Sequence, residues 1–224
     1  MSIDLTDQII EYIDENRVSS TEVADVLKKT GEVDIKLKPL VPRIRAVGRV
    51  YYAPAFNESN WYAHYFIQDA PKKHIIYVEG VNCGQRAIFG SLVSKYALLY
   101  KQAKGLIVSG NMRDVHTLVK EQYPIWYWGT TPIGCFNKDT GIDKEYYEKR
   151  KRELEGSIMV ADDSGVIIVK KEQLTQDFLE GLKRIEEQED IWFDCIDRRK
   201  FSTFETVCLR KYENLEGGGK TLSN

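Results

Sequence analysis

The apolar positions of the first thirty residues recur at helical spacing. Three isoleucines lie on one face of residues 6–16, which follow a candidate cap at Thr6. A second stripe occupies residues 21–29 behind a serine cap at position 19 or 20, and Gly31 ends it. The pattern therefore predicts two short amphipathic helices at the start of the chain.

The middle of the chain alternates short apolar runs with longer amphipathic ones. A strand, a helix of four or more turns and a further strand form a βαβ unit, whose two strands are parallel and whose crossover is right-handed. Residues 57–66 fit a helix as well as a loop. The expected order is a strand at 46–53, a strand at 74–79, a helix at 86–102, a strand at 105–109, a helix at 115–121 and a strand at 124–129.

The last third begins with a hairpin signal. Apolar runs at 158–161 and 166–169 flank Asp162-Asp-Ser-Gly165. A charged helix is expected at 171–190, and its apolar stripe is more than one small domain is expected to bury alone, which favours a homo-oligomer. We expect an α/β fold with one domain at 1–190, an extension at 191–214 that packs on the domain or on a partner subunit, and a flexible tail at 215–224.

Composition restricts the classes of function. With 42% apolar and 11% aromatic residues the chain can bury a core. The net charge of -2 and the absence of a basic run argue against direct contact with nucleic acid. No apolar window is long enough to cross a membrane, and the N-terminus lacks the features of a signal peptide, so we expect a cytoplasmic protein. Neither the four cysteines nor the three histidines have the spacing of a metal site, which predicts packed, reduced thiols and leaves oxygen ligands for any metal.

The residues best suited to binding a ligand or to catalysis follow the strand at 105–109. Ligands of open α/β sheets gather at such strand ends, and here the chain continues to Arg113 and Asp114. A guanidinium fork suits a carboxylate, whereas carboxylate oxygens suit Mg²⁺ or Mn²⁺. The alternatives are structural, because Asp114 could cap the following helix and Arg113 could form a surface ion pair.

The sequence segments that accompany Arg113 and Asp114 resemble those of a known family. Gly105-Leu-Ile-Val-Ser-Gly-Asn-Met-Arg-Asp-Val115 is preceded by Glu79-Gly80 and by Phe89-Gly-Ser-Leu-Val93, and the hairpin reads Asp162-Asp-Ser-Gly-Val166. With residues 19–27 and 37–42, these segments resemble the RraA-like family over roughly residues 18–190. The family includes the regulators of ribonuclease E activity and class II aldolases that act on 4-hydroxy-4-methyl-2-oxoglutarate and related oxaloacids.

The resemblance implies a fold, an assembly and a site. The fold is a swivelling β/β/α sandwich with a mixed sheet, assembled as a trimer or hexamer with a pocket between subunits. Arg113 would hold the carboxylate of a 2-oxo acid, and Asp114 would help to hold a divalent metal, Mg²⁺ or Mn²⁺, largely through water. The metal would polarise the 2-oxo group. Backbone amides of the loop that includes Gly90, Ser91, Leu92 and Val93 would complete the anion site.

The sequence departs from the aldolase pattern at one position. Aldolase members have an acidic residue after the glycine that matches Gly90, but this chain has Ser91, and the helix or its exit has one extra residue. The proton-transfer part of catalysis is therefore in question. Glu79 is the candidate substitute, although a glutamate at a strand end is more often solvated. Thr117 is a second difference, because many members have an acid there. Aldolase members also use a carboxylate from the C-terminal helix of a neighbouring subunit, and Glu186, Glu187 and Glu189 are the candidates for it in this chain.

Two functions follow from these residues. The intact Arg113 and Asp114 favour a metal-dependent lyase that cleaves or decarboxylates a 2-oxo acid. Ser91 favours a noncatalytic protein that binds a protein partner, as the ribonuclease regulators do. The slightly favoured expectation is the lyase.

Overall fold

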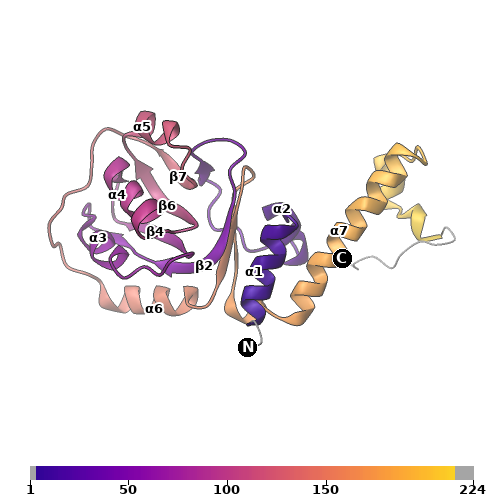
Figure 1. The fold of residues 1–224 in the computed structure, drawn as a ribbon, viewed down its shortest axis with the longest axis horizontal. Helices are drawn as coiled ribbons and strands as arrows, with labels where there is room; N and C mark the ends of the chain where they lie inside the picture. The colour runs from indigo at the N-terminus through magenta and orange to yellow at the C-terminus, as the bar shows by residue number, and fades with distance from the viewer. Residues whose placement is uncertain (1–3, 215–224) are drawn as a thin grey trace.

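The computed structural model describes residues 4–214 and arranges them around one mixed β-sheet (Figure 1). The strand order is β1-β7-β6-β4-β2-β8-β9, and two short strands, β3 and β5, pair with β4 and β6. The strands are β1 (Lys38–Pro39), β2 (Ala46–Tyr52), β3 (Ala55–Phe56), β4 (Ile75–Val81), β5 (Ala87–Phe89), β6 (Gly105–Met112), β7 (Ile125–Thr130), β8 (Ile158–Ala161) and β9 (Val166–Val169).

The register confirms the parallel pairing expected of the βαβ units. Ile75 on β4 is opposite Gly105 on β6, and Leu106 on β6 is opposite Ile125 on β7, all in parallel pairs. Strand β2 joins the two parts of the sheet, because it is parallel to β4 and antiparallel to β8. The hairpin of β8 and β9 is antiparallel, as its turn sequence predicts.

Side-chain alternation divides the sheet into two buried faces. On β4, Ile76 and Val78 point to one face, which is covered by α3 (Trp61–Ile67), α4 (Ser91–Lys95) with its π-helical continuation Tyr96–Tyr100, and α5 (Val115–Lys120). Ile75 and Tyr77 point to the other face, together with Leu154 of α6 (Lys144–Leu154). Residues two apart on β4 therefore point to the same face, so Glu79 lies on the face of Ile75 and Tyr77.

A third group of helices packs on the β8–β9 side of the sheet. It consists of α1 (Leu5–Glu15), α2 (Ser20–Val26) and α7 (Gln176–Asp197), which lie side by side (Figure 1). Ser19 and Glu22 form a capping box that starts α2. The apolar stripe of α7 is buried against these helices, with Phe178, Leu182 and Ile185 all at most 6% exposed. The expectation that one domain cannot bury this stripe was therefore wrong.

Several elements differ from the sequence-based expectation. Residues 57–66, left open between helix and loop, contribute most of α3. The helix expected from residue 86 begins at Ser91, because residues 87–89 join the sheet as β5. Helix α7 continues through residue 190 to Asp197, so Trp192 and Phe193 belong to it. Its C-terminal half extends away from the sheet (Figure 1) and contacts the π-helical Phe204–Cys208. The tail predicted at 215–224 lies outside the described residues.

Candidate active site

The end of β6 holds Arg113 and Asp114 by backbone contacts. The amide of Arg113 donates to the carbonyl of Phe89 at 2.9 Å, which joins the end of β6 to the segment before α4. Asp114 has a left-handed backbone (φ 60°), a conformation that Asp tolerates better than most residues. Helix α5 starts immediately afterwards at Val115. Two helix starts and one strand end therefore meet at this corner.

The Asp114 side chain caps a different helix from the one expected. Its Oδ2 accepts hydrogen bonds from the Ser91 amide at 3.0 Å and from the Ser91 hydroxyl at 3.2 Å, and it makes no cap bond to α5. Ser91 is the first residue of α4. A Cβ at position 90 would lie 2.3 Å from Asp114 Oδ2, so a larger residue there would displace the carboxylate. The carboxylate is thereby fixed in place by α4.

The Arg113 side chain is available to an anion. It is exposed, and among residues 4–214 it has no ion-pair or hydrogen-bond partner for its guanidinium. The alternative of a surface ion pair is therefore not realised in this part of the chain. The backbone of Gly134 lies against the guanidinium, because a Cβ added there would be 2.7 Å from Arg113 Nη1. One side of the fork is thus supported by the loop that follows β7.

The donor set beside Arg113 suits a hydrated cation. Asp114 Oδ1 accepts no hydrogen bond from the described residues, so one carboxylate oxygen is free. Within residues 4–214 no three His, Cys, Asp or Glu side chains are grouped to enclose a metal ion. Mg²⁺ commonly keeps several waters and binds through one or two carboxylates together with its substrate. Asp114 fits that mode and does not fit a fully protein-enclosed site.

One backbone donor of the loop expected to bind an anion is already used by another residue of the chain. Of Gly90, Ser91, Leu92 and Val93, glycine and valine are buried, whereas Leu92 is 80% exposed. The Ser91 amide is already used by Asp114. The amides of Leu92 and Val93 belong to the first turn of α4, where backbone donors have no partner within the helix.

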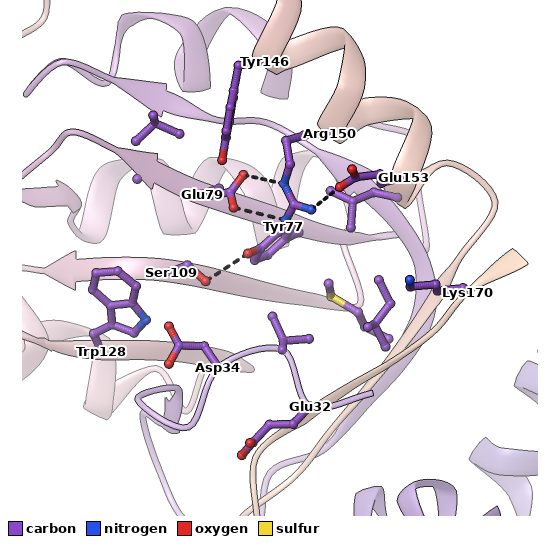
Figure 2. A pocket seen from close by; sticks show the side chains of 16 residues that line it. Glu32, Asp34, Tyr77, Glu79, Ser109, Trp128, Tyr146, Arg150, Glu153 and Lys170 are labelled. Carbon is purple, nitrogen blue, oxygen red and sulfur yellow. Dashed lines mark hydrogen bonds and ion pairs between the residues drawn. The ribbon is translucent and has the colours of Figure 1, made fainter. Parts of the chain in front are cut away.

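Glu79 lies on the opposite face of the sheet from α4. It shares the side of Tyr77 on β4 and faces a cavity of about 420 Å³, together with Ser109 (Figure 2). Its carboxylate accepts hydrogen bonds from Arg150 at 3.1 and 3.2 Å and from the Tyr52 hydroxyl at 2.7 Å. The structure therefore does not bring Glu79 together with Arg113 and Asp114.

The pair of Glu79 and Arg150 dominates the electrostatics of that cavity. Arg150 also bonds Glu153 at 2.6 Å, and the hydrogen bonds to both carboxylates raise the Arg150 pKa although burial acts in the opposite direction. Burial and the charge of Glu79 raise the pKa of Tyr77 to about 12. Sequence reasoning missed Arg150, because it passed over α6. A cap at Asp143, followed by the charged residues 144–154, is the signal that could have found the helix.

A family model for RraA-like proteins, described as Aldolase/RraA, matches residues 20–168. This chain belongs to the RraA-like family. A curated relative, protein DlpA of Legionella pneumophila, is 24% identical over 173 residues, which cover 70% of this chain and 27% of that protein. The RraA-like chain thus spans about a quarter of that relative.

Solved structures confirm the RraA-like fold. An uncharacterized protein from Pseudomonas syringae pv. tomato has a TM-score of 0.68 at 19% identity, covering 89% of this chain and 96% of its own. RraAS2 of Streptomyces coelicolor, described as an unusual member of the RNase ES inhibitor RraA protein family, has a TM-score of 0.63 at 17% identity, covering 82% and 94%. At these identities the likeness concerns the fold alone.

A π-helical turn can account for the extra residue expected between Ser91 and Arg113 in this RraA-like chain. Helix α4 continues as a π-helix at Tyr96–Tyr100, and the Lys101 amide donates to the Tyr96 carbonyl at 3.0 Å. A π turn contains one residue more than an α turn. It can therefore absorb an added residue while leaving Ser91 in contact with Asp114.

The carboxylates named for a neighbouring subunit differ in availability. Glu186 accepts a hydrogen bond from Tyr12 of its own chain. Glu189 is half-buried, and burial, followed by the charges of Glu22 and Asp25, raises its pKa. Glu187 is exposed. The amide of Thr117 donates to the Asp114 carbonyl within α5.

Proposed function

We propose that this RraA-like protein binds a small 2-oxo acid at Arg113 and acts on it as a divalent-metal-dependent lyase, by retro-aldol cleavage or oxaloacetate-type decarboxylation. The observation that supports the proposal most is the contrast between two adjacent side chains. Arg113 has an unpartnered, exposed guanidinium, whereas Asp114 is fixed by Ser91 and keeps one oxygen free. The residues that we propose for the anion and for the cation are thus adjacent in the chain.

Each residue has a defined part in this proposal. Arg113 holds and orients the substrate carboxylate through its planar fork. Asp114 Oδ1 contributes one ligand to Mg²⁺ or Mn²⁺, and the bound cation supplies polarisation of the 2-oxo group. The Ser91 hydroxyl lies next to the same carboxylate but is a weak acid and base, so proton transfer is left to water. We therefore expect slow turnover.

A noncatalytic regulator is the second candidate. It is favoured by Ser91 in place of an acid and by the pairing of Glu79 with Arg150 in a separate cavity. Its partner would be a protein, since a net charge of -2 gives little attraction for RNA. Submicromolar binding to single-stranded RNA at physiological salt would contradict that choice of partner.

The proposal includes assembly as a trimer or hexamer. It is supported by an exposed apolar face of α4 and its π-helical continuation, which begins next to Ser91. Its residues are Leu92, Tyr96, Leu99 and Tyr100, each at least 40% exposed. An apolar face of this kind commonly marks a protein interface. Light scattering should show an oligomer at micromolar concentration, and a stable monomer would remove any pocket between subunits.

Calorimetry with oxalate, which mimics an enolate, tests the main proposal. We expect oxalate to bind more tightly with Mg²⁺ than with EDTA, and oxaloacetate to be converted slowly to pyruvate only with the metal. Binding that is identical in the two conditions would refute the metal-dependent lyase. Metal-dependent binding without any pyruvate formation would instead support a ligand-binding regulator.

A further inference from the structure

Two cysteines far apart in the sequence meet beside the Arg113 corner. Cys83 lies in the turn between β4 and β5 and is 4% exposed, whereas Cys135 lies in the loop after β7 and is half-buried. The Cys83 thiol donates to the Val81 carbonyl at 3.6 Å, the thiols of Cys83 and Cys135 interact with each other, and both side chains pack in the same apolar cluster. Two free thiols that lie beside each other in this way can be joined by a disulfide when their Cβ atoms point toward one another.

The backbone around Cys135 is held in register with β5. The Ala87 amide donates to the Ile133 carbonyl at 2.8 Å, and the Cys135 amide donates to the Ala87 carbonyl at 2.8 Å. On its other side, the Phe136 amide donates to the Glu58 carbonyl at 2.8 Å. The contact between the thiols is therefore fixed by paired backbone on both sides of Cys135.

A cationic side chain lies close to this contact. Arg86 donates to the Gly134 carbonyl at 3.1 Å, bonds Glu58 at 2.8 Å, and places its guanidinium 4.3 Å from the centre of the Phe136 ring. The hydrogen bond from Cys135 lowers the pKa of the Cys83 thiol, while the bond to Cys83 and burial raise the pKa of Cys135. Because the thiolate is the nucleophile, Cys83 is the residue that reacts first.

We propose that Cys83 and Cys135 are a modification site at which a hydroperoxide converts the two thiols into an intramolecular disulfide. The Cys83 thiolate attacks the peroxide, forming an S–O bond and breaking the O–O bond, and the leaving oxygen takes up a proton. The Cys135 sulfur then attacks the sulfenic acid, forming the S–S bond and releasing water. Two thiols lose two electrons and two protons, and hydrogen peroxide becomes two molecules of water.

The modification would act on the loop that supports Arg113. Gly134 precedes Cys135 and lies against the Arg113 guanidinium, so a bond from Cys135 to the β4–β5 turn fixes that loop to the sheet. The bond closes a long segment of chain, which restricts the unfolded state and stabilises the fold. This inference concerns the thiols and does not depend on whether Arg113 binds a 2-oxo acid.

The test is peptide mapping of the full chain. The reduced protein is treated with a small excess of hydrogen peroxide, its free thiols are alkylated, and it is digested without reduction. We expect peptides containing Cys83 and Cys135 to be linked with the loss of two hydrogen atoms, and the melting temperature to rise by several degrees until dithiothreitol reverses it. Cys208, which is exposed, should not enter this link.

Matched variants make the result specific. Cys208→Ser should leave both the linked peptides and the rise in melting temperature intact, whereas Cys135→Ser should abolish both. Recovery of Cys83 and Cys135 as thiols, as sulfinic acids or in links to other cysteines would overturn the proposal. Mapping of the unaltered chain decides this even if a variant fails to fold.

Discussion

The Asp114 carboxylate accepts a hydrogen bond from the Ser91 amide at 3.0 Å and so caps α4, although Asp114 itself precedes α5. This bond joins the end of β6 to the first turn of a helix that comes earlier in the chain. It also places residue 91, the position where aldolase members have an acid, in direct contact with the proposed metal ligand. The departure at Ser91 therefore lies within the candidate site.

Removal of the Arg113 fork should weaken anion binding selectively. Arg113→Ala loses charge-assisted hydrogen bonds, which are worth about 1.5–3 kcal/mol, so oxalate affinity should fall by about tenfold to a hundredfold. Arg113→Lys keeps the charge without the fork, so its oxalate affinity should lie between that of Arg113→Ala and that of the unaltered protein. Calorimetry measures the affinity, and Mg²⁺ binding in both variants should equal that of the unaltered protein. Unchanged oxalate binding in Arg113→Ala would place the anion elsewhere.

Two substitutions at Asp114 separate its cap from its metal ligand. Asn keeps an oxygen for the Ser91 amide and tolerates the left-handed backbone, so Asp114→Asn should retain the melting temperature and lose the effect of Mg²⁺ on oxalate binding. Asp114→Ala loses the cap as well, at a cost of about 1 kcal/mol in unfolding free energy. If Asp114→Asn binds oxalate with the same Mg²⁺ dependence as the unaltered chain, Asp114 is a cap only.

Restoration of an acid at position 91 should create a stronger metal site. The Ser91 hydroxyl is 3.2 Å from Asp114 Oδ2, so Ser91→Asp brings two carboxylates together. Their repulsion should lower the melting temperature in EDTA, and Mg²⁺ should reverse that loss. Ser91→Asn, which has the same shape without the charge, should show no such response. An equal response to Mg²⁺ in the two variants would show that the new carboxylate does not reach the cation.

The role of Glu79 can be tested through its partner. Arg150→Met leaves the Glu79 side chain, which is 19% exposed, with Tyr52 and Tyr146 as hydrogen-bond partners and no cation, and we expect a loss of about 1–2 kcal/mol in unfolding free energy after allowance for solvent. Glu79→Gln should also lower stability and should leave oxalate binding unchanged. Denaturant titration and calorimetry measure the two effects. A loss of turnover in Glu79→Gln at unchanged stability would instead restore Glu79 as a proton donor.

The elements that sequence predicted well are those with strong local signals. The β8–β9 hairpin follows from its Asp-Asp-Ser-Gly turn, and the parallel strands follow from continuous apolar runs. Strand β5 was missed because its three residues are too few to show a period. Its place depends on pairing with β6, which is a tertiary effect.

The sequence proposes which residues belong to the candidate site, and the structure shows how those residues are arranged. Arg113 and Asp114 could be named because they follow a strand end, but the sequence does not show that Asp114 turns back to α4 or that Glu79 faces away from it. The pairing of Glu79 with Arg150 joins residues on β4 and α6 that no local pattern connects. Such contacts arise only when the sheet and its helices are packed together.

The half-buried carboxylate of Glu189 should make stability depend on pH. Burial, followed by the charges of Glu22 and Asp25, raises its pKa in the folded state above the value in the unfolded chain. A raised carboxyl pKa means that the folded state prefers the protonated form. The ionised Glu189 carboxylate therefore lowers the free energy of unfolding. This destabilisation is absent below the pKa of the unfolded chain and is fully present above the pKa of the folded chain. Glu189→Gln should therefore raise the melting temperature at pH 7 to 8, and the gain should disappear near pH 4. Glu172→Gln, at an exposed position, should show no comparable gain. A Glu189→Gln gain of equal size at both pH values would mean that the substitution acts through packing and not through charge.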